Sequence, residues 1–100
     1  MKMTITKTLN GTELTVALEG RLDTTTAPQL EKELQPELAG ITALTFDFAE
    51  LQYISSAGLR VLLGAHKAMM KQGGLTIRNV NETIMEIFDV TGFVDILNIV

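Results

Sequence analysis

The apolar residues of this chain change their period along its length, from two to about 3.6 and back, and this alternation limits the fold more than any other feature. Strand-like alternation lies on both sides of Asn10-Gly11, a pair typical of two-residue hairpin turns. We therefore predict a hairpin in which a strand near Met3–Leu9 pairs with a second strand over Leu14–Leu18. Gly20 should end this second strand.

Residues that favour helix starts follow the hairpin. Asp23 and Thr24–Thr26 precede Pro28, and a proline in the first turn of a helix has no backbone N–H to leave unpaired. Pro36 should end or bend this first helix, because proline cannot continue the helical hydrogen bonds. The buried face of the helix is indicated by leucines spaced four apart: Leu30, Leu34 and Leu38.

The rest of the chain repeats the order of strand and helix. We predict a buried strand over Ala43–Phe48, then a loop, and then a second helix from about Ser56 to Gln72. Gly73-Gly74 should stop this helix before a fourth strand over Leu75–Val80. The side chains expected on the buried face of the second helix lie at helical spacing: Leu59, Leu62, Leu63, Met69 and Met70.

A third helix should begin after Asn81 and stop at Thr91-Gly92, whereas Phe93–Val100 fits either a short helix or a strand. The resulting order, β-β-α-β-α-β-α plus a short C-terminal element, predicts an α/β fold in a single domain over residues 1–100. Its parallel crossovers require a mixed β-sheet with helices packed on it. A functional site is then expected at the carboxyl ends of the parallel strands.

The chain has few of the residues that catalysis or metal binding needs. It has no cysteine, and its one histidine, His66, lies more than two helical turns from Ser56 in the second predicted helix. No phosphate-binding or dinucleotide-binding glycine motif occurs. We therefore expect no enzyme activity, no metal and no cofactor. The net charge of -4 and the lack of a long apolar run argue against nucleic-acid and membrane partners, and we expect a cytoplasmic protein.

The start of the second predicted helix, at Ser55 and Ser56, remains the main candidate site. Serine is a preferred helix N-cap, so capping alone would explain these residues. Alternatively, a phosphate on an exposed hydroxyl here would face the free N–H groups and positive dipole of the helix start. It would add about -1.5 to -2 charges without unfolding the helix, which makes it a usable binding switch.

Several segments, in the same order and at the same spacing, resemble the STAS domain of bacterial anti-sigma factor antagonists. They are Gly20–Asp23, Phe46–Phe48 with Tyr53–Leu62, Gly73–Leu75, and the C-terminal Phe88–Phe93. The resemblance covers essentially the whole chain and implies a STAS-like fold. It also implies a regulator that binds an anti-sigma factor, and this anti-sigma factor is also a serine kinase. The resemblance further implies that phosphorylation of the regulator abolishes this binding and that a serine phosphatase restores it.

The resemblance implies the phosphoacceptor and the partner-binding residues as well. Many family members place the acceptor hydroxyl immediately before the glycine, where this chain has Ala57. Ser56 is therefore the predicted acceptor and Ser55 the second choice. The alternatives are constitutive binding without phosphorylation and a scaffolding or sensory STAS module; we expect a monomer or weak dimer. The predicted partner-binding residues are Asp23, Thr24, Ser55, Ser56, Ala57, Gly58, Leu59 and Arg60.

Overall fold

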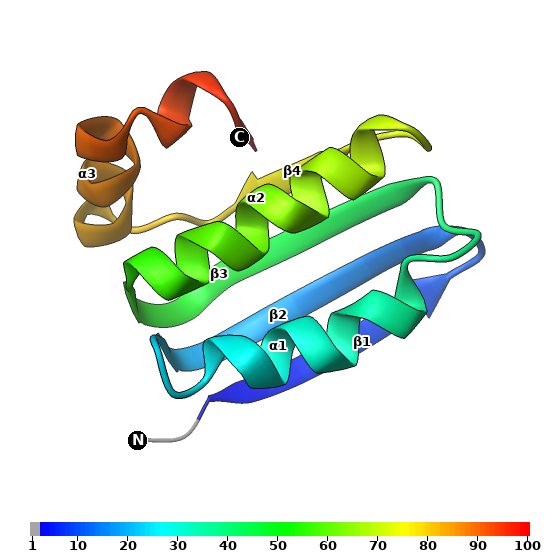
Figure 1. Cartoon of the computed structure of the whole chain (residues 1–100), viewed down its shortest axis with the longest axis horizontal. Coiled ribbons are helices and arrows are strands. Elements are labelled where there is room, and N and C mark those ends of the chain that lie inside the picture. The colour runs from blue at the N-terminus through cyan, green and yellow to red at the C-terminus, as the bar shows by residue number, and fades with distance from the viewer. Residues whose placement is uncertain (1–2) are drawn as a thin grey trace.

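The computed structural model describes residues 3–100 and shows one sheet in the strand order β1-β2-β3-β4-β5 (Figure 1). The strands are β1 (Thr4–Asn10), β2 (Glu13–Leu22), β3 (Ala43–Ile54), β4 (Leu75–Arg78) and β5 (Asn98–Ile99). The helices are α1 (Ala27–Leu34), α2 (Ser56–Met70) and α3 (Glu82–Thr91), with 3-10 turns at Gln35–Glu37 and Phe93–Asp95. β1 pairs with β2 antiparallel and the other pairs are parallel, which confirms the predicted mixed sheet and element order.

One face of the sheet is apolar and packs under the helices. Figure 1 shows α1 and α2 lying side by side on this face, with α3 apart from them near the end of β3. The fully buried side chains of β3, including Phe46 and Phe48, alternate with polar residues such as Thr45 and Asp47. This alternation is the period of a half-buried strand, so the register of the sheet places the core beneath α1 and α2.

Two strands are longer than the sequence predicts. β2 does not end at Gly20 but continues to Leu22, and Gly20 (φ 106°) lies at a shift in the pairing register with β3. β3 does not end at Phe48 but continues to Ile54, where a loop was expected. The two extensions pair with each other, from Glu19 opposite Glu50 to Leu22 opposite Ile54. Because the hydrogen bonds come from a partner strand distant in sequence, local patterning missed them.

The buried face of α2 also differs from the prediction. Leu59, Leu62 and Met69 are buried as expected, but Leu63 is only half-buried and Met70 is 68% exposed. The positions that replace them are Val61 and Ala65, and one residue along a helix turns the side chain by about 100°. Met70 therefore lies on a different side of α2 from Met69.

The predicted ends of α1 and α3 are confirmed, whereas α2 ends at Met70 rather than Gln72 and β4 ends at Arg78 rather than Val80. α1 gives way to a 3-10 turn containing Pro36. The Asn81 side chain accepts a hydrogen bond from the Ile84 N–H at 2.9 Å, and Gly92 ends α3 in the left-handed conformation at φ 80°. The segment Phe93–Val100 contains both a 3-10 turn and a short strand. No helix in the described part of the chain combines the length and apolar character needed to cross a membrane.

Candidate functional site

The carboxyl ends of β2 and β3 lie next to each other at one edge of the sheet. Leu22 pairs with Ile54, and the Ser55 N–H donates a hydrogen bond to the Leu22 carbonyl at 2.9 Å. The loop that begins at Asp23 and the helix that begins at Ser56 therefore leave the sheet side by side. The structure thus brings together the two segments that contain the predicted site residues, which we call the serine edge: Asp23, Thr24, Ser55 and Ser56.

Ser55 holds the N-cap position of α2, yet its side chain does not cap the helix. Its backbone is extended (φ -101°, ψ 177°), and its carbonyl accepts the first helical bond from the Leu59 N–H at 3.0 Å. Its Oγ is buried and has no hydrogen-bond partner among the described residues. Capping by a serine hydroxyl, one of the two explanations open from the sequence, is therefore wrong for Ser55.

Ser56 is the first residue of α2 and is exposed to solvent. The first turn of α2 contains no acidic residue, and no side chain caps it. The N–H groups at this end therefore lack side-chain acceptors, and the positive end of the helix dipole is uncompensated. An anionic group attached to the Ser56 hydroxyl would lie at the position where helix starts favour negative charge.

Gly58 lets the first turn of α2 pack directly onto the strand ends. A Cβ at this position would stand 2.7 Å from Leu22 Cγ and 2.9 Å from Ile54 Cγ1, closer than real Cβ atoms come. Gly58 and Leu59 are both buried, and Ala57 is half-buried. Gly58 and Leu59, predicted as partner contacts, thus support the site from beneath.

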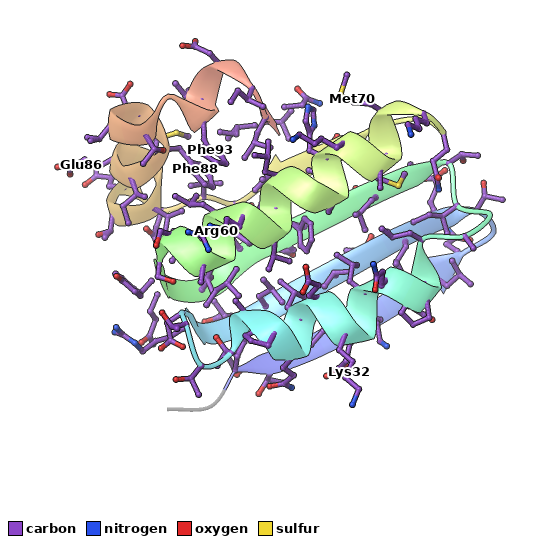
Figure 2. The ribbon with its side chains drawn as sticks, in the orientation of Figure 1. Lys32, Arg60, Met70, Glu86, Phe88 and Phe93 are labelled. Carbon is purple, nitrogen blue, oxygen red and sulfur yellow. The ribbon has the colours of Figure 1, made fainter. Side chains whose placement is uncertain are left out.

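Arg60 completes the exposed part of the predicted set. It lies one turn after Ser56 and is exposed, and Figure 2 shows its side chain on the outer side of α2. Together with Thr24 and Ser56, it forms the part of the predicted surface that another molecule can reach.

Asp23 holds the loop between β2 and α1. Its Oδ1 accepts hydrogen bonds from the N–H groups of Thr25 at 3.0 Å and Thr26 at 3.2 Å. The pKa of Asp23 lies below its ordinary value, chiefly because the Thr26 N–H donates a hydrogen bond to its carboxylate. The Thr25 N–H, the Thr26 hydroxyl and the charge of Arg21 lower this pKa further. The N-cap residue of α1 is Thr26 rather than Asp23, so Asp23 fixes the turn that leads into the helix.

A pair of side chains to which the sequence pattern gives no separate role joins the two strand ends. Arg21 and Tyr53 are cross-strand partners, and the Arg21 guanidinium carbon lies 4.4 Å from the centre of the Tyr53 ring. Arg21 Nε is also 3.8 Å from Asp23 Oδ2. The signal that would have found this pair is the strand register, which local patterning does not contain.

Other polar groups lie away from the serine edge. His66 is ten residues after Ser56, about 15 Å along the helix axis, so the two cannot form a nucleophile–base pair. Asp47 pairs with Arg78 at the end of β4. The side-chain N–H of Asn79 donates a hydrogen bond to Asp47 Oδ1 at 2.9 Å, which lowers the pKa of Asp47. Among residues 3–100, no three His, Cys, Asp or Glu side chains gather as metal ligands.

Comparison with known proteins agrees with this fold. The family model described as "Mlab, STAS domain" matches residues 5–98. An anti-sigma-B factor antagonist of Bacillus subtilis (strain 168) is 34% identical over 91 residues, covering 90% of this chain and 84% of that protein.

Solved structures show the same fold at lower identity. An anti-sigma factor antagonist from Mycobacterium paratuberculosis superposes with a TM-score of 0.89 at 21% identity, covering 98% of this chain and 85% of that chain. The Bacillus cell fate determinant SpoIIAA, in its phosphorylated form, gives a TM-score of 0.75 at 17% identity and covers 97% of this chain and 91% of that chain. With a match over nearly its whole length and the element order in place, this chain belongs to the STAS domain family, which includes the anti-sigma factor antagonists.

Proposed function

We propose that this protein is an anti-sigma factor antagonist that works by partner switching. Unphosphorylated, it binds an anti-sigma factor that is also a serine kinase, and a phosphate on Ser56 weakens that binding. The observation that carries this proposal is the exposed Ser56 hydroxyl at the uncapped start of α2, beside the loop of Asp23. The bound ATP belongs to the kinase partner, and the role implies action in the cytoplasm, where bacterial transcription takes place.

The accessibility of the two serines favours Ser56 as the acceptor. A kinase must bring the acceptor hydroxyl to the γ-phosphate of ATP, which requires an oxygen that solvent can reach. Ser56 is exposed, whereas Ser55 Oγ is buried beneath the start of α2. Ser55 could accept a phosphate only if the helix start first moved away from the strand ends.

A phosphate on Ser56 changes the surface and leaves the fold intact. It would interact with the uncapped N–H groups of α2, which stabilises an anion at this position. It would also add about -1.5 to -2 charges at a place that the partner covers when it binds the unphosphorylated chain. The partner would then lose a complementary contact through both charge and bulk.

The relatives support the assignment. The Bacillus subtilis relative is named as an anti-sigma-B factor antagonist, and SpoIIAA has been solved in both an unphosphorylated and a phosphorylated form. The fold that carries the phosphate in SpoIIAA is also the fold of this chain.

A second candidate rests on Ala57, which leaves the position immediately before Gly58 without a hydroxyl. A chain without a phosphate acceptor would serve as a STAS scaffold or sensory module that binds its partner constitutively. A serine phosphatase would then have no substrate here. The oligomeric state, monomer or weak dimer, stays a prediction.

Phosphorylation by an anti-sigma factor kinase separates the two candidates. The chain is incubated with the kinase and ATP, and its intact mass and modified residue are determined by mass spectrometry. We expect one phosphate on the wild type, one on Ser55→Ala and none on Ser56→Ala. Absence of phosphate on the wild type, with stable binding of the kinase, would favour the scaffold instead.

A further inference from the structure

The exposed side of α2 carries Arg60 and Lys67, followed by Lys71 just after the helix end, and no anionic residue. Between Leu51 and Asn81 the chain contains no Asp or Glu. Five exposed residues lie on one stripe that runs along α2 and one residue past its end: Ser56, Arg60, Gly64, Lys67 and Lys71. They share this stripe because they are spaced four, four, three and four residues apart. We call these residues the α2 stripe. It begins at the proposed acceptor and extends about 22 Å along the helix axis.

An apolar hollow adjoins this stripe between α1 and α2. Its volume is about 150 Å³, and Figure 1 shows the two helices side by side where it lies. Apolar and small side chains form most of its wall, with Glu31 and Gln35 of α1 as the polar members; the others are Leu34, Leu38, Val61, Gly64, Ala65 and Ala68. Figure 2 shows Lys32, the neighbouring cation of α1, directed away from α2.

Gly64 belongs to both the α2 stripe and the hollow, and the fold itself does not require a glycine there. A Cβ at Gly64 would meet no heavy atom of the described residues within 4 Å. By contrast, a Cβ at Gly58, in the same helix, would stand 2.7 Å from Leu22 Cγ. A mid-helix glycine destabilises a helix relative to alanine, and at this exposed position its missing side chain leaves room for another backbone or side chain to approach closely.

We propose that the partner contact continues from the serine edge along the α2 stripe, where an acidic surface of the anti-sigma factor docks and inserts an apolar side chain into the hollow beside Gly64. This inference rests on the proposed function and names the chemistry of the partner surface. Opposite charge selects the partner's acidic side chains for Arg60, Lys67 and Lys71. The apolar wall of the hollow suits an apolar side chain of the partner, and Gly64 lets the partner approach the helix backbone closely.

The docking mode also explains how one phosphate releases the partner. Ser56 and Arg60 are four residues apart, the spacing at which an anion preceding a cation along a helix pairs with it. A phosphate on Ser56 would draw Arg60 into such a pair and remove it from the partner. Its remaining negative charge would repel the partner's acidic surface at the same end of the α2 stripe.

The test measures the Kd of the complex between the full chain and the anti-sigma factor kinase of the organism that encodes it, at low and at physiological ionic strength. One variant is Gly64→Gln, which adds bulk at the hollow but is a better helix former. The other is Lys67→Glu/Lys71→Glu, which reverses the charge of the α2 stripe far from Ser56. Matched controls are Val90→Gln, at a position 82% exposed on α3, and Lys7→Glu/Lys32→Glu, with the same change in net charge.

We expect each of the two test variants to raise Kd tenfold or more, while the thermal midpoint of Gly64→Gln equals or exceeds that of the wild type. The charge-reversal variant should also lose most of the salt dependence, and both controls should bind within threefold of the wild type. The inference is overturned if the wild type binds and either test variant stays within threefold of it. If the wild type itself does not bind, the proposed function fails and the inference falls with it.

Discussion

Gly58 lies so close to Leu22 that a Cβ on the glycine would stand 2.7 Å from the leucine Cγ. This contact sets how near the start of α2 comes to the end of β2, and therefore how the exposed Ser56 is placed beside the loop of Asp23. Since both residues are buried, the position of the serine edge depends on packing beneath it.

Gly58→Ala should therefore destabilise the fold, because a methyl group in this space forces Leu22 and Ile54 to move. We expect the free energy of unfolding to fall by about 1–3 kcal/mol, the usual range for overpacking a core. Urea denaturation followed by circular dichroism measures the change. Gly64→Ala is the matched control in the same helix, and it should raise the stability by up to about 1 kcal/mol. Equal effects at the two glycines would contradict this packing.

Ser55→Ala should leave the stability nearly unchanged. A serine that caps a helix contributes about 1 kcal/mol through its hydroxyl, but Ser55 Oγ makes no hydrogen bond in the described structure. Removing it takes away a buried unpaired polar atom and leaves the helix bonds as they are. Urea denaturation of the wild type and the variant decides this, and a loss of about 1 kcal/mol would show that the hydroxyl does cap α2.

Asp23 and Asp47 should make the stability depend on acid pH. The pKa of each is lowered in the folded state, by hydrogen bonds from Thr26 for Asp23 and from Asn79 for Asp47. The unfolded chain then binds protons more readily than the folded one, so the stabilisation is complete above the ordinary pKa of 3.8 and is lost as the pH falls through the lowered values.

Urea denaturation at a series of pH values from 7 downward measures this effect. Asp23→Asn/Asp47→Asn should be less stable than the wild type at neutral pH and should lose less stability in acid. Parallel curves for the two proteins would show that other carboxylates account for the acid dependence.

The pair formed by Arg21 and Tyr53 should stabilise the serine edge. A cation over a tyrosine ring at a partly exposed site contributes about 0.5–1 kcal/mol. A double-mutant cycle with Arg21→Ala, Tyr53→Ala and the combined variant isolates this coupling, and a second cycle uses Tyr53→Phe in place of Tyr53→Ala. Phenylalanine should keep most of the coupling because the ring is retained. A coupling energy near zero would mean that the two side chains do not interact in solution.

Much of the fold could be predicted from local patterns. The helix starts and stops rest on short-range chemistry, as Asn81 at the start of α3 and Gly92 at its end show. The hairpin is likewise local, although its two-residue turn is Gly11-Thr12, one residue later than the Asn10-Gly11 pair indicated, because Asn10 pairs with Glu13. The segment Ser55–Arg60 also lies where the sequence predicted it, at the carboxyl ends of parallel strands, because the order of strands and helices limits where parallel strands can end.

The order of elements, the helix limits and the identity of the candidate segment were thus determined by the sequence alone, since they depend on residues near one another in the chain. Only the tertiary structure decided that β2 and β3 extend together to Leu22 and Ile54, because their hydrogen bonds join segments more than 30 residues apart. The same packing decided that Ser55 Oγ is buried while Ser56 is exposed, since one residue turns a helical side chain by about 100°. Adjacent serines with the same chemistry therefore differ in what can reach them.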